Sequence, residues 1–331
     1  MVTITDIAQR LGVAVSTVSK GLNDANDISE TTKAMILHTA VEMGYASRRV
    51  QKSGLRKMCI FAEEESFQCE DQFGYDLAMG FRVAAAQNGW QVSTASYRLI
   101  LDSQDPVDTY MLRHDFAGAF FIRRHFSPDC LNPLTNTAFP TVLFEGEVDN
   151  PLVGSVGNDH GRGILMAVEH LYRLGHRRIA MFNSGREYSI TRHRETAYRA
   201  ALDAFRLEFD RSLLVYYGGE GSIRPAIGQL LENGATAVLC AGNCISTSVM
   251  SQLLELGRRV PEEISILGFD DCPRARIRNY PLTTIRQDNF ALGKAAFYML
   301  EGLRNKIPIQ NLLLRPNLVV QESTAPCGKP A

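Results

Sequence analysis

The sequence predicts a small all-α domain followed by a larger α/β core with two lobes, each built on a parallel, doubly wound sheet. Residues 3–23 have the apolar spacing of two short helices around a glycine. From Met58 onward, short apolar runs alternate with helical patterns, which is typical of parallel sheets covered by helices on both faces. Because the roughly 270 residues of this pattern exceed one usual doubly wound sheet, we expect two lobes.

The first two predicted helices have the size and spacing of a helix-turn-helix unit. Gly12 separates them, and a third helix is predicted from Ser29 to Met43. The positions that would form their core are Ile4, Ile7, Ala8, Leu11, Val13, Val18 and Leu22. The second helix leaves small or polar side chains exposed, namely Ala14, Val15, Ser16, Thr17, Ser19 and Lys20. Such side chains suit base edges and phosphates, although two amphipathic helices around a glycine also occur in other helical domains.

The distribution of charge favours contact between the N-terminal region and phosphates. The whole chain has a net charge of −1, which by itself hides any nucleic-acid character. Residues 1–57 carry eight Lys/Arg against five Asp/Glu, and residues 45–57 carry five basic residues and no acid. A solvated linker could have this composition, but its position directly after the predicted helices favours phosphate contact.

Other function classes find little support in the sequence. The seven cysteines are odd in number and irregularly spaced, which indicates free, buried thiols in a reducing cytosol and no zinc site. An apolar signal segment and a run of 18 or more apolar residues are both missing, so we expect neither export nor membrane insertion. Motifs for a nucleophile, a phosphate-binding loop, a dinucleotide site or a metal are also missing. We therefore expect no enzyme activity, no metal and no cofactor.

The core pattern gives the following elements in chain order. Strands are predicted near 58–63, 91–96, 118–122, 141–145, 153–157, 178–183, 213–217, 236–240 and 264–268. Helices are predicted at 74–88, 160–174, 192–206, 224–233, 245–257 and 289–304. Ligands of parallel sheets bind at the carboxyl ends of strands, so polar residues just after each strand are the candidate ligand contacts.

Several motifs are specific enough to indicate a family. The N-terminal ones are Thr-Ile-Thr-Asp-Ile-Ala at 3–8, Gly-Val at 12–13, Ser-Thr-Val-Ser-Lys at 16–20, Asn23, Ile28-Ser29, Thr32 and Gly44-Tyr45. Later ones are Leu-Gly-His-Arg-Arg-Ile-Ala at 174–180, Val-Pro at 260–261, Gly-Phe-Asp-Asp at 268–271 and Leu-Thr-Thr-Ile at 282–285. Together they resemble the LacI/GalR family of bacterial transcription regulators over essentially the whole chain.

The resemblance implies a helix-turn-helix headpiece joined to a core with the fold of type I periplasmic sugar-binding proteins. The implied domains are a headpiece at 1–45, a basic hinge at 46–57 and an effector-binding and dimerisation core at 58–331. Within the core, the N-subdomain would comprise about 58–157 and 288–316, and the C-subdomain about 158–287 and 317–331. The chain would cross between the lobes near 157–159, 286–288 and 315–319.

The resemblance also implies a function. We expect a cytoplasmic, homodimeric repressor that binds a pseudo-palindromic operator in double-stranded DNA and associates with the nucleoid when bound. A small-molecule effector between the lobes, a sugar or sugar derivative, would control operator affinity. The alternative is a cytoplasmic small-molecule sensor with weak or vestigial DNA binding. The implied DNA-binding residues are Thr3, Thr5, Ala14, Val15, Ser16, Thr17, Ser19, Lys20, Asn23, Ser29, Arg49 and Leu55.

The hinge departs from the family pattern. The family normally places a leucine wedge where this chain has Gly54, and Leu55 follows one residue later. Glycine costs about 1 kcal/mol relative to alanine inside a helix, which weakens the prediction of a hinge helix. Leu55 is therefore either a wedge in a shifted register or an ordinary linker residue.

The effector-binding residues implied by the resemblance are Phe73, Arg123, Glu145, Arg194, Glu220, Asn243 and Asp270. Arg194 and Asp270 match the family's ligand-contacting arginine and carboxylate, although Asp270 could instead cap a helix. Arg123, Glu220 and Asn243 differ from the commoner sugar-binding pattern. Two arginines with one carboxylate fewer suggest an anionic effector, such as a sugar acid or sugar phosphate.

Two further segments bear on the predicted oligomeric state. Helix 74–88 is a candidate interface element, and burial inside its own lobe is the alternative. The C-terminal tail has no leucine heptads, so we expect no tetramer through a C-terminal helix.

Overall fold

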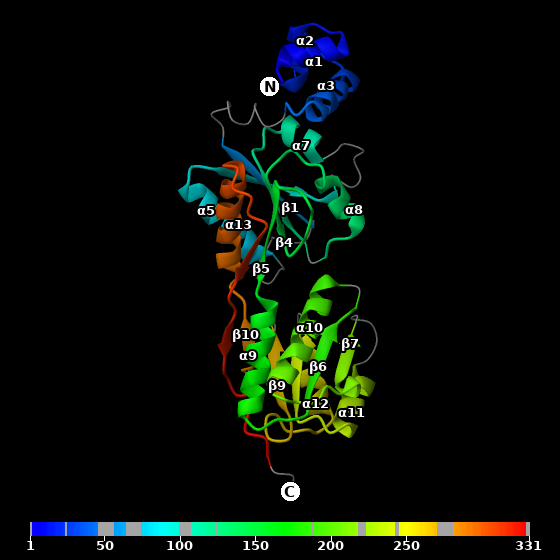
Figure 1. The fold of residues 1–331 in the computed structure, drawn as a ribbon, viewed down its shortest axis with the longest axis vertical. Coiled ribbons are helices and arrows are strands. Elements are labelled where there is room, and N and C mark those ends of the chain that lie inside the picture. Colours follow the sequence, from blue (N-terminus) through cyan, green and yellow to red (C-terminus); the bar gives the residue numbers. More distant parts are fainter. Residues whose placement is uncertain are drawn as a thin grey trace. The chain divides into compact units, whose positions relative to one another are not determined.

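The computed structural model describes the chain except for residues 1, 24, 46–55, 64–73, 99–106, 124, 187, 218–222, 242–244, 270–280 and 329–331. It divides into two compact units (Figure 1). Unit 1 comprises Met1–Gly157 and Asn289–Leu312, and unit 2 comprises Asn158–Asp288 and Leu313–Ala331. Each unit contains one six-stranded sheet, and unit 1 also contains the N-terminal headpiece. The predicted fold class, an all-α headpiece followed by two mainly parallel α/β sheets, is confirmed.

The headpiece consists of α1 (Ile4–Leu11), α2 (Val15–Leu22) and α3 (Glu30–Glu42). Gly12 ends α1 with a φ of 65°, a left-handed conformation that glycine adopts without steric cost. Ser29 caps α3, because its Oγ accepts a hydrogen bond from the Thr32 backbone N–H. The small core of the three helices is made by Ile7, Ala8, Val18, Leu22, Ile36, Leu37 and Ala40, each at most 4% exposed.

The sheet of unit 1 has the strand order β11-β5-β4-β3-β1-β2. Its strands are β1 (Lys57–Ala62), β2 (Gln91–Ser96), β3 (Ala119–Ile122), β4 (Thr141–Phe144), β5 (Val153–Asn158) and β11 (Asn311–Leu314). The pairs from β2 through β1, β3 and β4 to β5 are parallel. Side chains alternate between the two faces, so Phe61 and Phe121 stack on one face while Phe120 stacks on Phe81 on the other.

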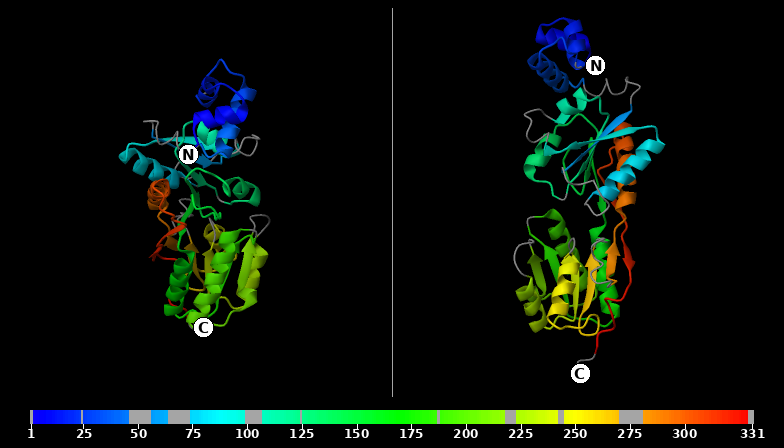
Figure 2. Two further views of the ribbon diagram at one scale, coloured as in Figure 1. Left: turned by 45° about the horizontal axis from the view of Figure 1, so that its top comes forward. Right: turned by 180° about the vertical axis from the view of Figure 1, so that it is seen from behind.

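Helices α5 (Tyr75–Gln87) and α13 (Asn289–Arg304) lie side by side along one face of this sheet (Figures 1 and 2). Leu77, Phe81, Ala84 and Ala85 of α5 are buried within the unit, so burial in the lobe is the observed role of these side chains. Two short helices, α7 (Val107–Arg113) and α8 (Pro128–Leu131), contribute Met111, Leu112 and Cys130 to the core on the other face.

The sheet of unit 2 has the strand order β12-β10-β9-β8-β6-β7. Its strands are β6 (Ile179–Ser184), β7 (Leu214–Tyr217), β8 (Ala237–Ala241), β9 (Ser265–Phe269), β10 (Thr283–Arg286) and β12 (Asn317–Val319), of which β12 alone in this sheet runs antiparallel to its described neighbour. The helices are α9 (His160–Arg173), α10 (Ser189–Ala204), α11 (Arg224–Glu232) and α12 (Ile245–Glu255).

Strands β6, β8 and β9 are apolar throughout because both faces of the sheet are covered. Met181, Leu239 and Leu267 pack with residues of α9 and α10, whereas their chain neighbours Phe182 and Cys240 pack with residues of α11 and α12. This alternation is the physical reason that a continuous apolar run, rather than an apolar/polar alternation, predicted these strands.

Several elements differ from the sequence prediction. Helix α10 begins at Ser189 instead of 192, and α7, α8, β10, β11 and β12 were not predicted. β11 and β12 contain four and three residues, and each of their positions is half-buried or exposed, so they lack both the length and the buried apolar pattern of the central strands.

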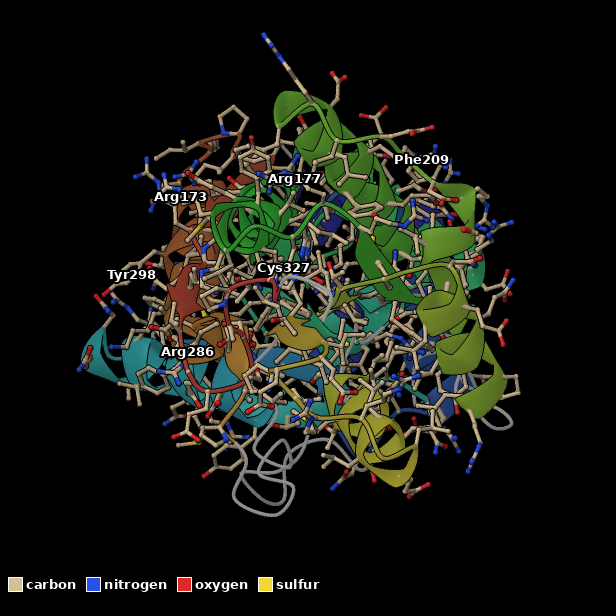
Figure 3. The ribbon with its side chains drawn as sticks, turned by 90° about the horizontal axis from the view of Figure 1, so that it is seen from below. Arg173, Arg177, Phe209, Arg286, Tyr298 and Cys327 are labelled. Carbon is tan, nitrogen blue, oxygen red and sulfur yellow. The ribbon has the colours of Figure 1, made fainter. Side chains whose placement is uncertain are left out.

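The C-terminal segment from Gln321 to Cys327 forms a strap along unit 2. Ser323 is fully buried; its Oγ donates to the Ile266 carbonyl at 2.6 Å and accepts from the Thr283 N–H at 2.8 Å. Cys327, labelled in Figure 3, lies at the carboxyl end of α9, where its N–H donates to Leu174 O at 2.7 Å. This segment has a turn at 322–323 and, in its described residues, no helix.

His176 joins the strap to the sheet. Its Nε2 lies 3.1 Å from Ala325 O, a carbonyl that can only accept, so Nε2 carries the proton and Nδ1 accepts from the Thr236 hydroxyl at 3.0 Å. The next residue, Arg177, satisfies a carbonyl at the end of α9 by donating to Tyr172 O at 2.9 Å.

Acidic pH is expected to destabilise unit 2 through His176. Burial lowers the pKa of this imidazole below its ordinary value of 6.5. The unfolded chain therefore binds more protons in the window below pH 6.5, so the stability present above 6.5 is lost as pH falls towards the folded-state pKa. Calorimetric melting between pH 7.5 and 5 should show a falling melting temperature, with a smaller fall in His176→Gln. The exposed His193→Gln serves as the control, and an equal fall in all three proteins would contradict the assignment.

Three of the predicted free thiols, Cys59, Cys130 and Cys240, are buried and unbridged. Cys327 is free and half-buried, and Cys69, Cys244 and Cys272 lie outside the described residues. Among the helices that the structure describes, none has both the length and the apolar character needed to span a bilayer.

Candidate functional site

The turn between α1 and α2 presents the second helix for contact with a ligand. Thr3 and Asp6 form a capping box: the Asp6 carboxylate accepts from the Thr3 N–H at 2.7 Å, and the Thr3 hydroxyl accepts from the Asp6 N–H. The Val13 N–H donates to Ala8 O at 3.1 Å and closes the turn. The residue before α2, Ala14, makes no side-chain cap, so its side chain leaves the first backbone N–H groups of α2 uncovered.

The exposed face of α2 consists of Ala14, Val15, Ser16 and Lys20. Val15 is 46% exposed, although an apolar side chain of this size gains free energy from burial. Thr17 and Ser19 are half-buried at the edges of this face. An exposed valine beside a hydroxyl and a cation fits the major groove, where thymine methyl groups, base edges and phosphates lie together.

Gly21 holds α2 close to α3. A Cβ at this position would lie 2.5 Å from Cδ1 and 3.3 Å from Cβ of Ile36, so a larger residue would displace this buried side chain. The absence of a side chain at Gly21 lets α2 pack closely on α3, and the opposite face of α2 remains towards solvent. Gly21 was not singled out from the sequence, because a close contact between helices has no local signal.

Lys20 forms an ion pair with Asp27, which lies in the loop after α2. The side chains are 52% and 57% exposed, so the pair is screened and weak. The same contact lowers the pKa of Asp27. A phosphate bound to Lys20 would have to displace this carboxylate, so Asp27 would compete with DNA for Lys20.

Changing this pair should shift DNA affinity in opposite directions. Lys20→Ala should weaken binding and reduce the salt slope by about one phosphate contact. Asp27→Asn should strengthen binding by about fivefold at most, because an exposed ion pair is weak. Glu42→Gln makes the same charge change in the headpiece without touching Lys20, so titrations in which it matches Asp27→Asn would show a general charge effect only.

The remaining predicted DNA-binding residues have varied settings. Thr5 is exposed in the first turn of α1, Asn23 follows α2, and Ser29 is occupied as the cap of α3. Arg49 and Leu55, and with them the question of the hinge helix at Gly54, lie outside the described residues.

In unit 2, Arg194 lies at the carboxyl edge of the sheet. It is 3% exposed, and its Nη1 donates to Ala241 O at the end of β8 at 3.2 Å. Its Nε donates to the His160 Nδ1 at 3.3 Å, and its guanidinium lies 4.2 Å from the ring of Phe269 at the end of β9. Arg194 thus joins β8, β9 and the start of α9 at the edge where parallel sheets bind ligands.

Polar side chains that the sequence did not single out lie at the same edge. Asn183, at the end of β6, is fully buried and donates to Thr191 O at 3.0 Å. The hydroxyls of Thr191 and Thr247 are buried and have no hydrogen-bond partner within the described part of the chain. Buried hydroxyls are usually paired, so these two are additional candidates for contact with a hydroxyl-rich ligand. Their positions inside helix starts carried no sequence signal.

In unit 1, Arg123 follows β3 and is already paired. Its Nη2 lies 3.1 Å from Glu63 Oε1, its Nε donates to His125 O at 3.1 Å, and its guanidinium lies 4.6 Å from the Tyr97 ring. Glu63 was missed because it comes from a different strand end, after β1. The pair balances one of the two positive charges from which an anionic effector was predicted.

The other predicted effector contacts are less defined. Glu145 follows β4 with a φ of 55°, an uncommon conformation for a residue other than glycine. Phe73, Glu220, Asn243 and Asp270 lie outside the described residues. Within the described residues, no group of three or more His, Cys, Asp or Glu side chains is placed to hold a metal ion.

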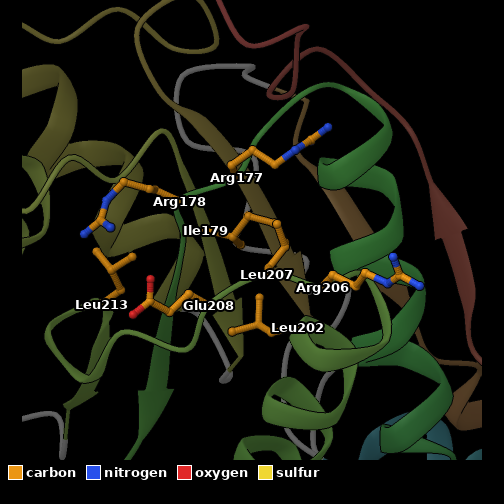
Figure 4. Close-up of a pocket in the computed structure, with 8 residues that line it drawn as sticks. All are labelled: Arg177, Arg178, Ile179, Leu202, Arg206, Leu207, Glu208 and Leu213. Atoms are coloured by element: carbon orange, nitrogen blue, oxygen red, sulfur yellow. The ribbon is translucent and has the colours of Figure 1, made fainter.

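A surface pocket of about 310 Å³ lies at the opposite edge, where β6 and β7 begin (Figure 4). Its cationic side chains are Arg177, Arg178 and Arg206, and in Figure 4 Arg178 projects to the opposite side from Arg177 and Arg206. Arg178 pairs with Asp210 at 2.6 Å and donates to Asn233 O, and Arg177 lies 4.1 Å from the Tyr172 ring. Because Arg177 and Arg178 already have partners and the three cations do not converge, we do not assign a ligand to this pocket.

The fold and these two sites define a class of protein: a DNA-binding domain joined to a small-molecule-binding module. Residues 3–47 match the model of bacterial regulatory proteins of the lacI family, and residues 168–324 match that of a periplasmic binding protein-like domain. The chain is a DNA-binding transcriptional regulator with a headpiece of the lacI family and a periplasmic binding protein-like core.

Relatives over nearly the whole chain agree with this assignment, and solved structures share the fold. The transcriptional regulator DegA of Bacillus subtilis is 26% identical over 98% of each chain, and the repressor PurR of Vibrio atlanticus is 23% identical over 98% of each chain. The fold resembles that of the regulator CelR in complex with cellobiose, with a TM-score of 0.67, 24% identity and coverage of 98% of this chain and 100% of that one. It also resembles the lac repressor dimer bound to operator and an anti-inducer, with a TM-score of 0.67, 22% identity and coverage of 98% and 99%.

Proposed function

We propose that the protein is a homodimeric repressor that binds a pseudo-palindromic operator through two headpieces. The observation that carries this proposal is the exposed face of α2, where Val15, Ser16 and Lys20 project from a helix whose other face is buried. One such helix contacts only a few base pairs, so two related by symmetry provide the specificity that an operator requires. Relatives that match nearly the whole chain are named repressors.

We further propose roles for the individual headpiece residues. Val15, Ser16 and Lys20 contact base edges, with Ala14 beside them at the groove. Lys20 also interacts with phosphate. The residues proposed to position the headpiece on phosphates are Thr3, Thr5, Thr17, Ser19, Asn23, Ser29 and Arg49, and Leu55 is proposed as a minor-groove contact.

The proposed effector is a sugar or sugar derivative that changes operator affinity. Arg194 supports this, because a buried planar guanidinium can donate to two acceptors on a ligand at the strand edge. A relative of similar fold is described in complex with cellobiose. The further contacts proposed are Phe73, Arg123, Glu145, Glu220, Asn243 and Asp270. Calorimetry with neutral and anionic sugars distinguishes the two effector classes, and tight binding of a neutral sugar undiminished by Arg123→Ala would overturn the anionic one.

The proposal extends to organisation and location. The domains are the headpiece at 1–45, the hinge at 46–57 and the core at 58–331, divided near 157, 288 and 316. We propose that the protein acts in the cytoplasm, associates with the nucleoid when bound to operator, and works by binding without catalysis.

Selection from random duplexes, followed by gel-shift titration at stated salt, tests the core of the proposal. Exchanging Val15 and Ser16 should change the preferred base at one or two positions, each worth about 1–3 kcal/mol, without lowering affinity for random DNA. Met35→Ala removes an apolar side chain that is 44% exposed on α3 and should leave the preference unchanged. A wild-type protein with no preference over random DNA would favour the alternative, a small-molecule sensor with vestigial DNA binding.

A further inference from the structure

The single tryptophan of the chain, Trp90, lies where the segment after the headpiece joins the core. It is 6% exposed and precedes β2. Two guanidinium groups lie over its ring: that of Arg304 at 4.3 Å and that of Arg56 at 5.6 Å from the centroid. Arg56 is the first described residue after 46–55 and directly precedes β1.

Arg56 is tied to the Trp90 turn by its backbone as well as its side chain. The Gln91 N–H donates to Arg56 O at 2.8 Å, and Arg56 Nη1 donates to Asn88 O at 3.3 Å. These contacts of Arg56, like that with the indole ring, fall on residues 88–91, the turn that carries Trp90. This turn fixes the point at which the basic hinge segment ends.

Arg304 reaches the same ring from α13. It is the last residue of that helix, and its Nη1 pairs with Glu301 Oε1 at 2.6 Å, with side chains only 22% and 28% exposed. At its other end, α13 begins at Asn289, where the chain passes from unit 2 back into unit 1. Sixteen helical residues span about 24 Å, so one rigid element runs from that crossing to the tryptophan.

We propose that Trp90, held by Arg56 and Arg304, is the anchor that fixes the carboxyl end of the hinge to α13 and so couples operator binding to the effector-binding core. The three residues are positioning residues that act on the hinge without touching DNA. This inference rests on the proposed function, since it concerns operator binding by the same headpiece.

The chemistry of the site supports an anchor rather than a surface contact. A cation over a tryptophan ring is attracted by the ring's electrons, and the attraction grows as water is excluded. Trp90 Nε1 is buried and has no hydrogen-bond partner among the described residues. The orientation of the ring is therefore set by packing and by the two guanidinium groups, and its fluorescence should depend on both.

Fluorescence of the full-length protein tests whether the anchor exists in solution, because no other tryptophan contributes. Arg304→Ala should shift the emission maximum to longer wavelength, and Arg56→Ala should do so by less, since its guanidinium is farther from the ring. Lys294→Ala is the matched control: it removes a cation that lies 4.7 Å from Phe290 on the same helix. Unchanged emission in both arginine variants would overturn the anchor.

Operator affinity tests what the anchor does. With a duplex selected by the wild-type protein as the probe, Arg304→Ala and Arg56→Ala should each weaken binding on the order of threefold to tenfold, with an unchanged salt slope. The double variant should bind the duplex with the same affinity as the weaker-binding single variant, because both substitutions break the same junction. Lys294→Ala should bind as the wild type does.

Two results would overturn the anchor while leaving the repressor intact. One is wild-type affinity in Arg304→Ala; the other is a salt slope lower by about one in Arg56→Ala with additive losses, which would make Arg56 a phosphate contact. A wild-type protein that selects no duplex would instead contradict the proposed function itself. Arg304→Lys keeps a cation over Trp90 and should recover operator affinity. If this variant has the melting temperature of the wild type but does not recover affinity, that result would also contradict the anchor.

Discussion

Gly293→Ala is expected to destabilise unit 1 by about 3 kcal/mol, a large effect for one methyl group. A Cβ at Gly293 would lie 2.0 Å from Leu77 O and 2.8 Å from Phe81 N. Both are backbone atoms of α5, so no side-chain rotation can make room. The helices α5 and α13 would have to separate, and the packing of Phe81 against Phe297 would loosen with them.

A glycine of α5 makes the matching close contact with the backbone of α13. A Cβ at Gly80 of α5 would lie 2.0 Å from Phe290 O of α13, so Gly80→Ala should be comparably destabilising. Glycine in a helix normally costs about 0.5–1 kcal/mol relative to alanine. That these two positions are glycine is therefore explained by close helix packing and not by helix formation.

Thermal unfolding followed by Trp90 emission measures this effect, because Trp90 belongs to unit 1. Gly228→Ala is the matched control, since a Cβ at this position within α11 would have no described atom within 4 Å, and the variant should gain about 0.5–1 kcal/mol. Because Gly228 lies in unit 2, the unfolding of this control variant is followed by circular dichroism instead of Trp90 emission. A Gly293→Ala protein that melts with the wild type would show that α5 and α13 are farther apart than the structure describes.

Arg194→Ala is expected to weaken effector binding by about 100-fold or more. Arg194 is 3% exposed and joins Ala241 O, His160 and the Phe269 ring at the strand edge. Removing one partner of a buried, charged hydrogen bond between protein and ligand costs about 2–5 kcal/mol, partly because the acceptor on the ligand is left buried and unpaired. Arg194→Lys should recover little, because an ammonium cannot reproduce the planar fork.

A thermal-shift screen of sugars and sugar acids on the wild-type protein identifies a ligand, and calorimetry then gives the affinities of the variants. Arg199→Ala is the matched control on the same helix: its side chain is 45% exposed and pairs with Glu195 at 2.8 Å. Operator binding without ligand should persist in all three variants. Equal ligand affinity in Arg194→Ala and the wild type would remove Arg194 from the effector site.

The headpiece was the most predictable part of the chain, because its information is local. The spacing of Ile7, Val18 and Leu22 and the break at Gly12 fix the helices and their buried face within a few turns of chain. The pair between Lys20 and Asp27 was not predicted, although the residues are close in sequence, because a loop conformation decides whether they meet.

The effector site was only partly predictable. Arg194 and Arg123 were identified as candidates, but their partners come from elsewhere in the chain: His160 and Ala241 for the first, and Glu63 for the second. The prediction of an anionic effector counted cations without knowing which of them a carboxylate already balances. Burial of Thr191 and Thr247 likewise depends on packing between helices and strands that no local pattern reports.

The sequence by itself determined the class of fold, the central strands and the exposed face of α2, because periodicity and turn residues act over a few positions. The tertiary structure decided the partners: Asp27 for Lys20, Glu63 for Arg123, Leu77 against Gly293, and the two arginines on Trp90. Such contacts join residues whose separation along the chain carries no regular pattern. They form only when the whole domain closes around them, since the loss of chain entropy on bringing distant segments together is offset by the packing of the entire core.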